Sequence, residues 1–265
     1  MSTLWVFGDS FTANHQPTGR PDLNTPWHWC QQVARGLGHA HYRNLATQGS
    51  SNEFQWSLVY NFRTDIQSGD TVIFQTTMIN REWLFEHSPE KGPYWNFLKE
   101  IADQHGSAAA RATEQYSQHL HWPARDHFRF EAQLLSLRQM AHERAWQLIV
   151  IPGFEDSLEH DSFRGVVQGC LHTIERDEFA NSFARISVYD REWKRIDRRA
   201  AHLVRPNHDL VAERVLAYAR DPRQGLDLAT GFHQKVINVG TRLDPEWLNQ
   251  IEWKPGRNDF EQVSW

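Results

Sequence analysis

A serine that directly follows a short apolar stretch is the first candidate for chemistry in this chain. Residues 4–7 read Leu-Trp-Val-Phe, a run long enough for one buried parallel strand, and Gly8, Asp9 and Ser10 follow. Gly8 allows the backbone to bend where a side chain would obstruct the turn. Ser10 would then emerge at the carboxyl end of the strand, where open α/β sheets bind ligands. A serine there is a candidate nucleophile if a histidine reaches it from elsewhere; alternatively, the tripeptide is a turn that only starts a helix.

Three later positions could complete such a site. Gly49 lies in the loop after a second apolar stretch, and a glycine there lets a backbone N–H approach a substrate oxygen, or serves the turn alone. Asn80 follows the third expected strand and could donate a side-chain N–H to the same oxygen; Thr77 is the alternative donor, and both could simply end the strand. His208 stands at the start of an expected helix, as a base or as a capping residue.

With these residues in view, residues 1–220 resemble the SGNH, or GDSL, hydrolases. The first block of that family is an apolar strand followed by Gly-Asp-Ser, and the second carries a glycine that helps to hold the oxyanion, matched here by Gly49. The resemblance implies that Ser10 is the nucleophile and His208 the base. It also implies an oxyanion hole formed by the N–H groups of Ser10 and Gly49 with help from Asn80.

Two blocks depart from the family pattern. The third block of the family reads Gly-x-Asn-Asp, whereas residues 76–81 read Thr-Thr-Met-Ile-Asn-Arg. The last block reads Asp-x-x-His, but Arg205 stands where the aspartate is expected. A phage-associated branch of the family carries a similar Arg-Pro-Asn-His string with its acid a little earlier, yet residues 203–204 offer no carboxylate.

An acid from the preceding segment is therefore expected to orient His208. Asp197 is the first choice because it lies nearer in the chain, and Asp190 is the alternative. A histidine at a helix N-terminus lies in a positive field that disfavours its protonated form, so a carboxylate should offset that field.

The predicted reaction is hydrolysis of an acyl or acetyl ester, on a small molecule or a glycan, through an acyl-enzyme. Loop residues 12–24 and an aromatic-rich insertion at residues 81–125 are expected to set substrate choice. Side chains expected to contact the substrate are Asp9, Asn52, Thr77 and Trp83. The alternative is a lapsed hydrolase fold that serves as a carbohydrate-binding or virion-assembly module.

The elements that must position these residues alternate between strand and helix. Strands are predicted at residues 4–7, 42–47, 71–75, 146–153 and 186–190, and amphipathic helices at residues 128–144 and 208–220. This alternation predicts an α/β fold with a mostly parallel five-stranded sheet between helices, a flavodoxin-like three-layer sandwich. Residues 1–220 would form this domain, and residues 221–265 a Trp-containing C-terminal extension.

The composition narrows the range of partners and locations. A formal net charge of -5 gives no basic surface for nucleic acid, and the apolar runs are of strand length, so no membrane span is expected. No signal peptide is visible, and two cysteines do not form a disulfide framework, which favours a cytoplasmic or virion-associated protein. The histidines show no metal-ligand spacing, so no metal or other cofactor is expected. The oligomeric state is left open.

Overall fold

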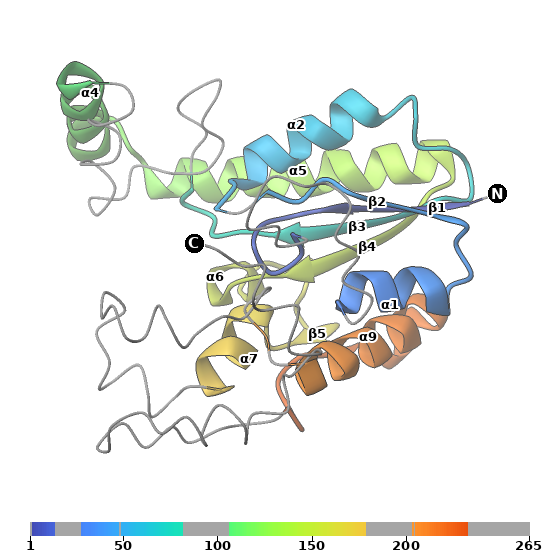
Figure 1. Cartoon of the computed structure of the whole chain (residues 1–265). Helices are drawn as coiled ribbons and strands as arrows, with labels where there is room; N and C mark the ends of the chain where they lie inside the picture. The colour runs from blue at the N-terminus through green and yellow to red at the C-terminus, as the bar shows by residue number, and fades with distance from the viewer. Residues whose placement is uncertain are drawn as a thin grey trace, which may run out of the picture.

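A computed structural model describes residues 2–13, 28–47, 49–81, 106–178, 203 and 205–232 (Figure 1). Its main sheet has the strand order β2-β1-β3-β4, and every neighbouring pair is parallel. The strands are β1 (Thr3–Phe7), β2 (His41–Asn44), β3 (Thr71–Thr76) and β4 (Gln147–Pro152). A second, two-stranded parallel sheet pairs β5 (Val167–Gln168) with β6 (Leu226–Asp227).

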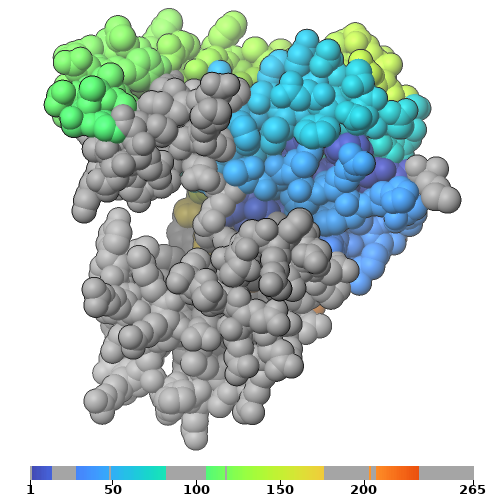
Figure 2. Space-filling model, turned by 45° about the horizontal axis from the view of Figure 1, so that its top comes forward, coloured from blue at the N-terminus to red at the C-terminus, as the bar shows by residue number. Residues whose placement is uncertain are grey.

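The sheet is covered by helices drawn from all parts of the described chain. The α-helices are α1 (Trp29–Gly36), α2 (Asn52–Phe62), α4 (Ser107–His119), α5 (Pro123–Arg144), α6 (Glu155–Leu158), α7 (Leu171–Glu178) and α9 (Arg205–Arg220). A 3-10 turn, η2 (Pro222–Gln224), follows α9. Helices α2 and α5 lie on one side of the sheet, and α1 and α9 lie side by side on the other (Figure 1). In the space-filling view, the N-terminal part of the chain, blue to cyan, forms one continuous surface that is bordered along the top by α5 (Figure 2).

The central strands are apolar because both of their faces are covered. Residues 4–7 of β1 and all six residues of β3 are buried, whereas β2 alternates between exposed and half-buried residues. Asp70 fixes the register at the start of β3, since its carboxylate accepts hydrogen bonds from the Thr3 N–H at 2.8 Å and the Trp5 indole at 2.9 Å. The register pairs Leu4 with Thr71 and Phe7 with Phe74.

The predicted α/β class and parallel sheet are confirmed, with several changes in element boundaries. The second strand ends at Asn44 rather than at residue 47. Helix α5 begins at Pro123, five residues before the predicted start, because proline is well suited to the first turn of a helix. Helix α9 begins at Arg205, so His208 lies within its first turn instead of opening it. The predicted strand at residues 186–190 lies outside the described residues.

Within the described ranges, no helix combines the length and the apolar character that a bilayer crossing requires.

Candidate active site

Ser10 lies in a tight turn that follows β1 at the carboxyl edge of the sheet. The chain leaves β1 toward β2 and leaves β3 toward β4, so the crossovers diverge between β1 and β3, where sheets of this order bind ligands. The Asp9 carbonyl accepts hydrogen bonds from the Thr12 and Ala13 N–H groups at 3.1 and 2.8 Å. The Asp9 carboxylate also accepts one from the Phe11 N–H at 3.1 Å. Ser10 itself is 9% exposed. The turn is therefore fixed on both sides of the serine.

Two buried glutamines hold the start of this turn. The Gln55 side-chain oxygen accepts a hydrogen bond from the Gly8 N–H at 2.9 Å, and that of Gln75 accepts one from the Asp9 N–H at 2.8 Å. Gln75 also accepts the Thr12 hydroxyl at 3.2 Å. A Cβ on Gly8 would lie 2.4 Å from the Thr12 hydroxyl oxygen, so the close packing requires glycine there. Sequence reasoning missed both glutamines. The only available signal concerned Gln75, a polar residue near the end of the apolar run of β3.

The Gly49 loop is joined to the Ser10 turn through Gly8 and Ser50. The Gly8 carbonyl accepts the Thr47 N–H at 2.9 Å and the Ser50 hydroxyl at 3.0 Å, and the Ser50 hydroxyl accepts Gln55 Nε2 at 2.9 Å. Gly49 has a φ of 72°, a conformation that side chains rarely adopt. The structure thus brings together the two loops that the sequence assigned to the nucleophile and the oxyanion.

Arg81 forms an ion pair with Asp9 and thereby links the same two loops. Arg81 Nη1 lies 3.0 Å from Asp9 Oδ2 and donates to the Ser50 carbonyl at 3.3 Å. The guanidinium also lies over the Phe154 ring, 4.9 Å from its centroid. Asp9 is fully buried, and a buried carboxylate is stable only with such a partner. Asp9, predicted to contact substrate, is thus engaged within the protein, and Arg81 is a site residue that the sequence did not reveal.

The segment after β3 is fastened to the start of α2. The Asn52 side chain donates to the Thr77 carbonyl at 2.9 Å and accepts the Thr77 N–H at 2.8 Å. Thr77 is buried, whereas Asn80 is exposed. Ser51 is the N-cap of α2, and its side chain accepts the Phe54 N–H at 3.2 Å. The Asn80 contribution to an oxyanion hole stays a prediction.

His208 reaches the Ser10 turn through Trp29. The Trp29 indole donates to the Phe11 carbonyl at 3.0 Å, and the Trp29 backbone N–H donates to His208 Nδ1 at 3.4 Å. His208 is fully buried, and its ring lies 4.9 Å from that of His28, the N-cap of α1. Because Nδ1 accepts a hydrogen bond, the neutral ring carries its proton on Nε2.

A second histidine lies at this edge together with its own carboxylate. His172 Nδ1 lies 2.9 Å from Glu155 Oε2, and the His172 ring stacks on Phe154 with the centroids 5.2 Å apart. The Phe11 ring meets His172 edge-on at 6.5 Å. Sequence reasoning did not single out this pair, because 17 residues separate its members.

The remaining predicted site residues are not placed. Asp197, its alternative Asp190, and Trp83 lie outside the described residues. Within the described part of the chain, no group of three or more His, Cys, Asp or Glu side chains is arranged to hold a metal ion. Burial raises the pKa of Asp156, although hydrogen bonds from the Ile79 and Ser157 N–H groups and the nearby Arg81 charge oppose this effect.

No protein-family model matches the sequence, and no curated protein matches it significantly.

Proposed function

We propose that this protein is a serine-dependent ester hydrolase with Ser10 as its nucleophile. The observation that best supports this proposal is the joining of the Ser10 turn to the Gly49 loop, in which the Gly8 carbonyl accepts hydrogen bonds from the Thr47 N–H and the Ser50 hydroxyl. The position between the diverging crossovers of β1 and β3 adds to it. The SGNH resemblance, which rests on residues 7–11 and Gly49, is consistent with the same role.

In the proposed reaction, Ser10 Oγ attacks the acyl carbon while its proton passes to a histidine. The developing oxyanion accepts hydrogen bonds from the N–H groups of Ser10 and Gly49, with Asn80 or Thr77 as a further donor. The alcohol leaves with the proton, and water then hydrolyses the acyl-enzyme. His208 is the base that the resemblance implies, with Asp197 as the proposed orienting acid. It can accept the serine proton only if its own proton moves from Nε2 to Nδ1, which would break the hydrogen bond from the Trp29 N–H.

A fluorophosphonate probe and an activated aryl ester test this function directly. We expect wild-type protein to be labelled and to hydrolyse the ester, and Ser10→Ala to do neither. Ser57→Ala is a matched control, because it removes a hydroxyl that only donates to the Phe54 carbonyl within α2. Equal labelling of wild type and Ser10→Ala would exclude Ser10 as the nucleophile.

A second candidate function is glycan binding or virion assembly by a lapsed hydrolase fold. The observation that favours it is the Trp29 N–H facing His208 Nδ1, where a catalytic carboxylate would otherwise stand. Binding of a glycan ester without turnover by wild-type protein would select this alternative.

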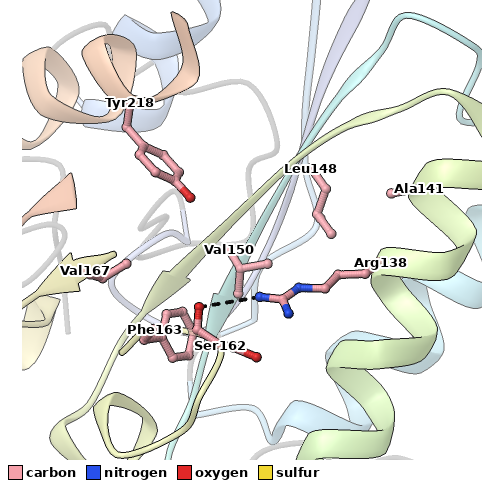
Figure 3. A pocket seen from close by; sticks show the side chains of 8 residues that line it. All are labelled: Arg138, Ala141, Leu148, Val150, Ser162, Phe163, Val167 and Tyr218. Atoms are coloured by element: carbon pink, nitrogen blue, oxygen red, sulfur yellow. Dashed lines mark hydrogen bonds between the residues drawn. The ribbon is translucent and has the colours of Figure 1, made fainter. Parts of the chain in front are cut away.

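We also propose that the fold is a flavodoxin-like three-layer sandwich with a fifth strand at residues 186–190, as the sequence predicts. The supporting feature is the placement of α2 and α5 on one side of the sheet and of α1 and α9 on the other (Figure 1). Beside β4, a hollow of about 200 Å³ borders Leu148 and Val150 on that strand and Arg138 on α5 (Figure 3). Within the described residues β4 pairs only with β3. Backbone hydrogen exchange that protects residues 186–190 as strongly as β3 would support this arrangement.

A further inference from the structure

We infer that His172, oriented by Glu155, is the base that exchanges protons with Ser10, an assignment that rests on the proposed serine chemistry. Glu155 lies just after β4 at the start of α6, and His172 lies at the start of α7. Its backbone N–H donates to the Gly153 carbonyl at 2.9 Å, which holds it against the end of β4. The carboxyl ends of β3 and β4 point toward α6 and α7 (Figure 1).

The contacts of His172 lead back to the Ser10 turn by two routes. Its ring meets that of Phe11, the residue after Ser10, edge-on at 6.5 Å. It also stacks on Phe154, whose ring lies 4.9 Å from the Arg81 guanidinium, and Arg81 is paired with Asp9, the residue before Ser10. His172 therefore contacts one sequence neighbour of Ser10, Phe11, directly. It is linked to the other neighbour, Asp9, through the side chains of Phe154 and Arg81.

The hydrogen bonding of His172 has the polarity that a base needs. A carboxylate can only accept, so Glu155 fixes the proton of the neutral ring on Nδ1 and leaves Nε2 as the acceptor. The second oxygen of Glu155 accepts the Thr173 hydroxyl at 3.3 Å, which holds the carboxylate in place. His208 shows the reverse polarity, because its Nδ1 already accepts from Trp29.

The charges around the two histidines also favour His172 over His208 as the base. The Glu155 carboxylate places a negative charge beside the His172 ring, and the Arg81 guanidinium contacts the same Phe154 ring as His172 does. His208 instead faces the first N–H groups of α1, the positive end of that helix. His172 is also 38% exposed in its side chain, so a substrate or water can reach it, whereas His208 is fully buried.

The proton transfers balance in both halves of the reaction. In the first, the Ser10 O–H bond breaks as the bond from Oγ to the acyl carbon forms; the proton moves to His172 and then to the departing alcohol oxygen. In the second half of the reaction, the water oxygen bonds to the acyl carbon while His172 takes a proton from the water molecule. The same proton returns to Ser10 Oγ as the acyl–oxygen bond breaks. In this scheme His208 is a positioning residue whose Nδ1 accepts the Trp29 N–H at the start of α1.

The tautomers can be measured without any substrate. Nitrogen-15 NMR of the neutral imidazoles, assigned with His172→Gln and His208→Gln, should place the proton on Nδ1 in His172 and on Nε2 in His208. A proton on Nε2 of His172 in folded wild-type protein would overturn the assignment.

Kinetics of ester hydrolysis then separate the assignment from the serine chemistry itself. His172→Gln should lower kcat/KM by about 10²–10⁴ with little change in Tm, and Glu155→Gln should also shift the acidic limb of the pH–rate profile. His142→Gln, an exposed change on α5, should leave both unaltered. If His208→Gln removes turnover while His172→Gln keeps it, the base is His208 and the inference is wrong. If Ser10→Ala retains wild-type turnover, or wild type has none, the serine chemistry fails and the inference fails with it.

Discussion

Asp9 is a residue whose role is decided by a partner far away in the chain. The Gly-Asp-Ser string predicts a turn, and the carboxylate does accept the Phe11 N–H within it. Its ion-pair partner, Arg81, is 72 residues distant and follows a different strand. Local sequence can predict the turn, but it cannot predict a salt bridge that exists only because β1 and β3 are neighbours.

Removing the Arg81 guanidinium should leave a buried, uncompensated charge on Asp9. We expect Arg81→Met to lower the free energy of unfolding by about 3 kcal/mol at pH 7, measured by urea denaturation. The double variant Asp9→Asn/Arg81→Met should recover part of this loss, because the stranded charge is gone. A double variant less stable than Arg81→Met would show that the pair acts in some other way.

Asp156 should contribute to the pH dependence of stability. Burial raises its pKa, so the folded protein binds this proton more tightly than the unfolded chain does. Its contribution is present below the ordinary carboxyl pKa and is lost as the pH rises through the raised value. The stability of Asp156→Asn relative to wild type should therefore be higher at pH 7 than at pH 4, by urea denaturation. Asp161 is exposed, so Asp161→Asn is the control. The same pH-dependent difference in this variant would contradict the explanation.

At the scale of elements, α5 was predictable because its periodicity is intrinsic to the sequence. The amphipathic helix predicted at residues 128–144 forms, and Phe130, Leu134, Leu137 and Ala141 are buried on one of its faces. Strands β1 and β3 were likewise evident as apolar runs, since both of their faces are covered.

The parts of the site that the sequence did not reveal are polar side chains whose partners come from other elements. Gln55 and Gln75 replace a neighbouring strand as acceptors for the N–H groups of Gly8 and Asp9. The His172–Glu155 pair forms only because α6 and α7 begin at the same end of β4. No spacing rule in one sequence encodes such pairings, whereas glycine and serine turns have local signatures.

Two leucines on α5 test the face assignment of that helix. Leu137 is fully buried, so Leu137→Ala should lower the free energy of unfolding by about 2–5 kcal/mol. Leu135 is 58% exposed, and Leu135→Ala should change it by no more than about 0.5 kcal/mol. Urea denaturation of both variants measures the difference, and similar losses would mean that the helix is turned relative to the sheet.

At the scale of the whole molecule, α1 from the N-terminal part of the described chain packs against α9 from its C-terminal part. Gln32 on α1 donates to Asp209 on α9 at 2.7 Å, and Arg220 donates to the Gly36 carbonyl at 3.0 Å. A Cβ on Gly36 would lie 2.6 Å from Leu216, so the two helices are packed closely at that point. Trp29, at the start of α1, extends this contact to the Ser10 turn.

Trp29→Phe should therefore weaken the site as well as the fold. The change removes the indole donor and leaves the Phe11 carbonyl without that hydrogen bond, which should cost about 1–3 kcal/mol. We also expect slower fluorophosphonate labelling of Ser10. Trp146→Phe is the matched control, because its buried indole donates to the Ile66 carbonyl at 3.2 Å. Slower labelling in both variants to the same degree would indicate a general loss of stability.

The hydrogen bond between Trp29 and His208 spans 179 residues, and this separation governs when the edge can be completed during biosynthesis. A ribosome adds about 5–20 residues per second, so roughly 10–40 s pass between the synthesis of the two residues. During that interval α1 has no α9 to pack against, and the first N–H of the helix lacks its imidazole acceptor. A nascent chain would thus carry the Ser10 turn long before it could assemble the edge around it, because that edge is complete only after residues 205–220 have been synthesised.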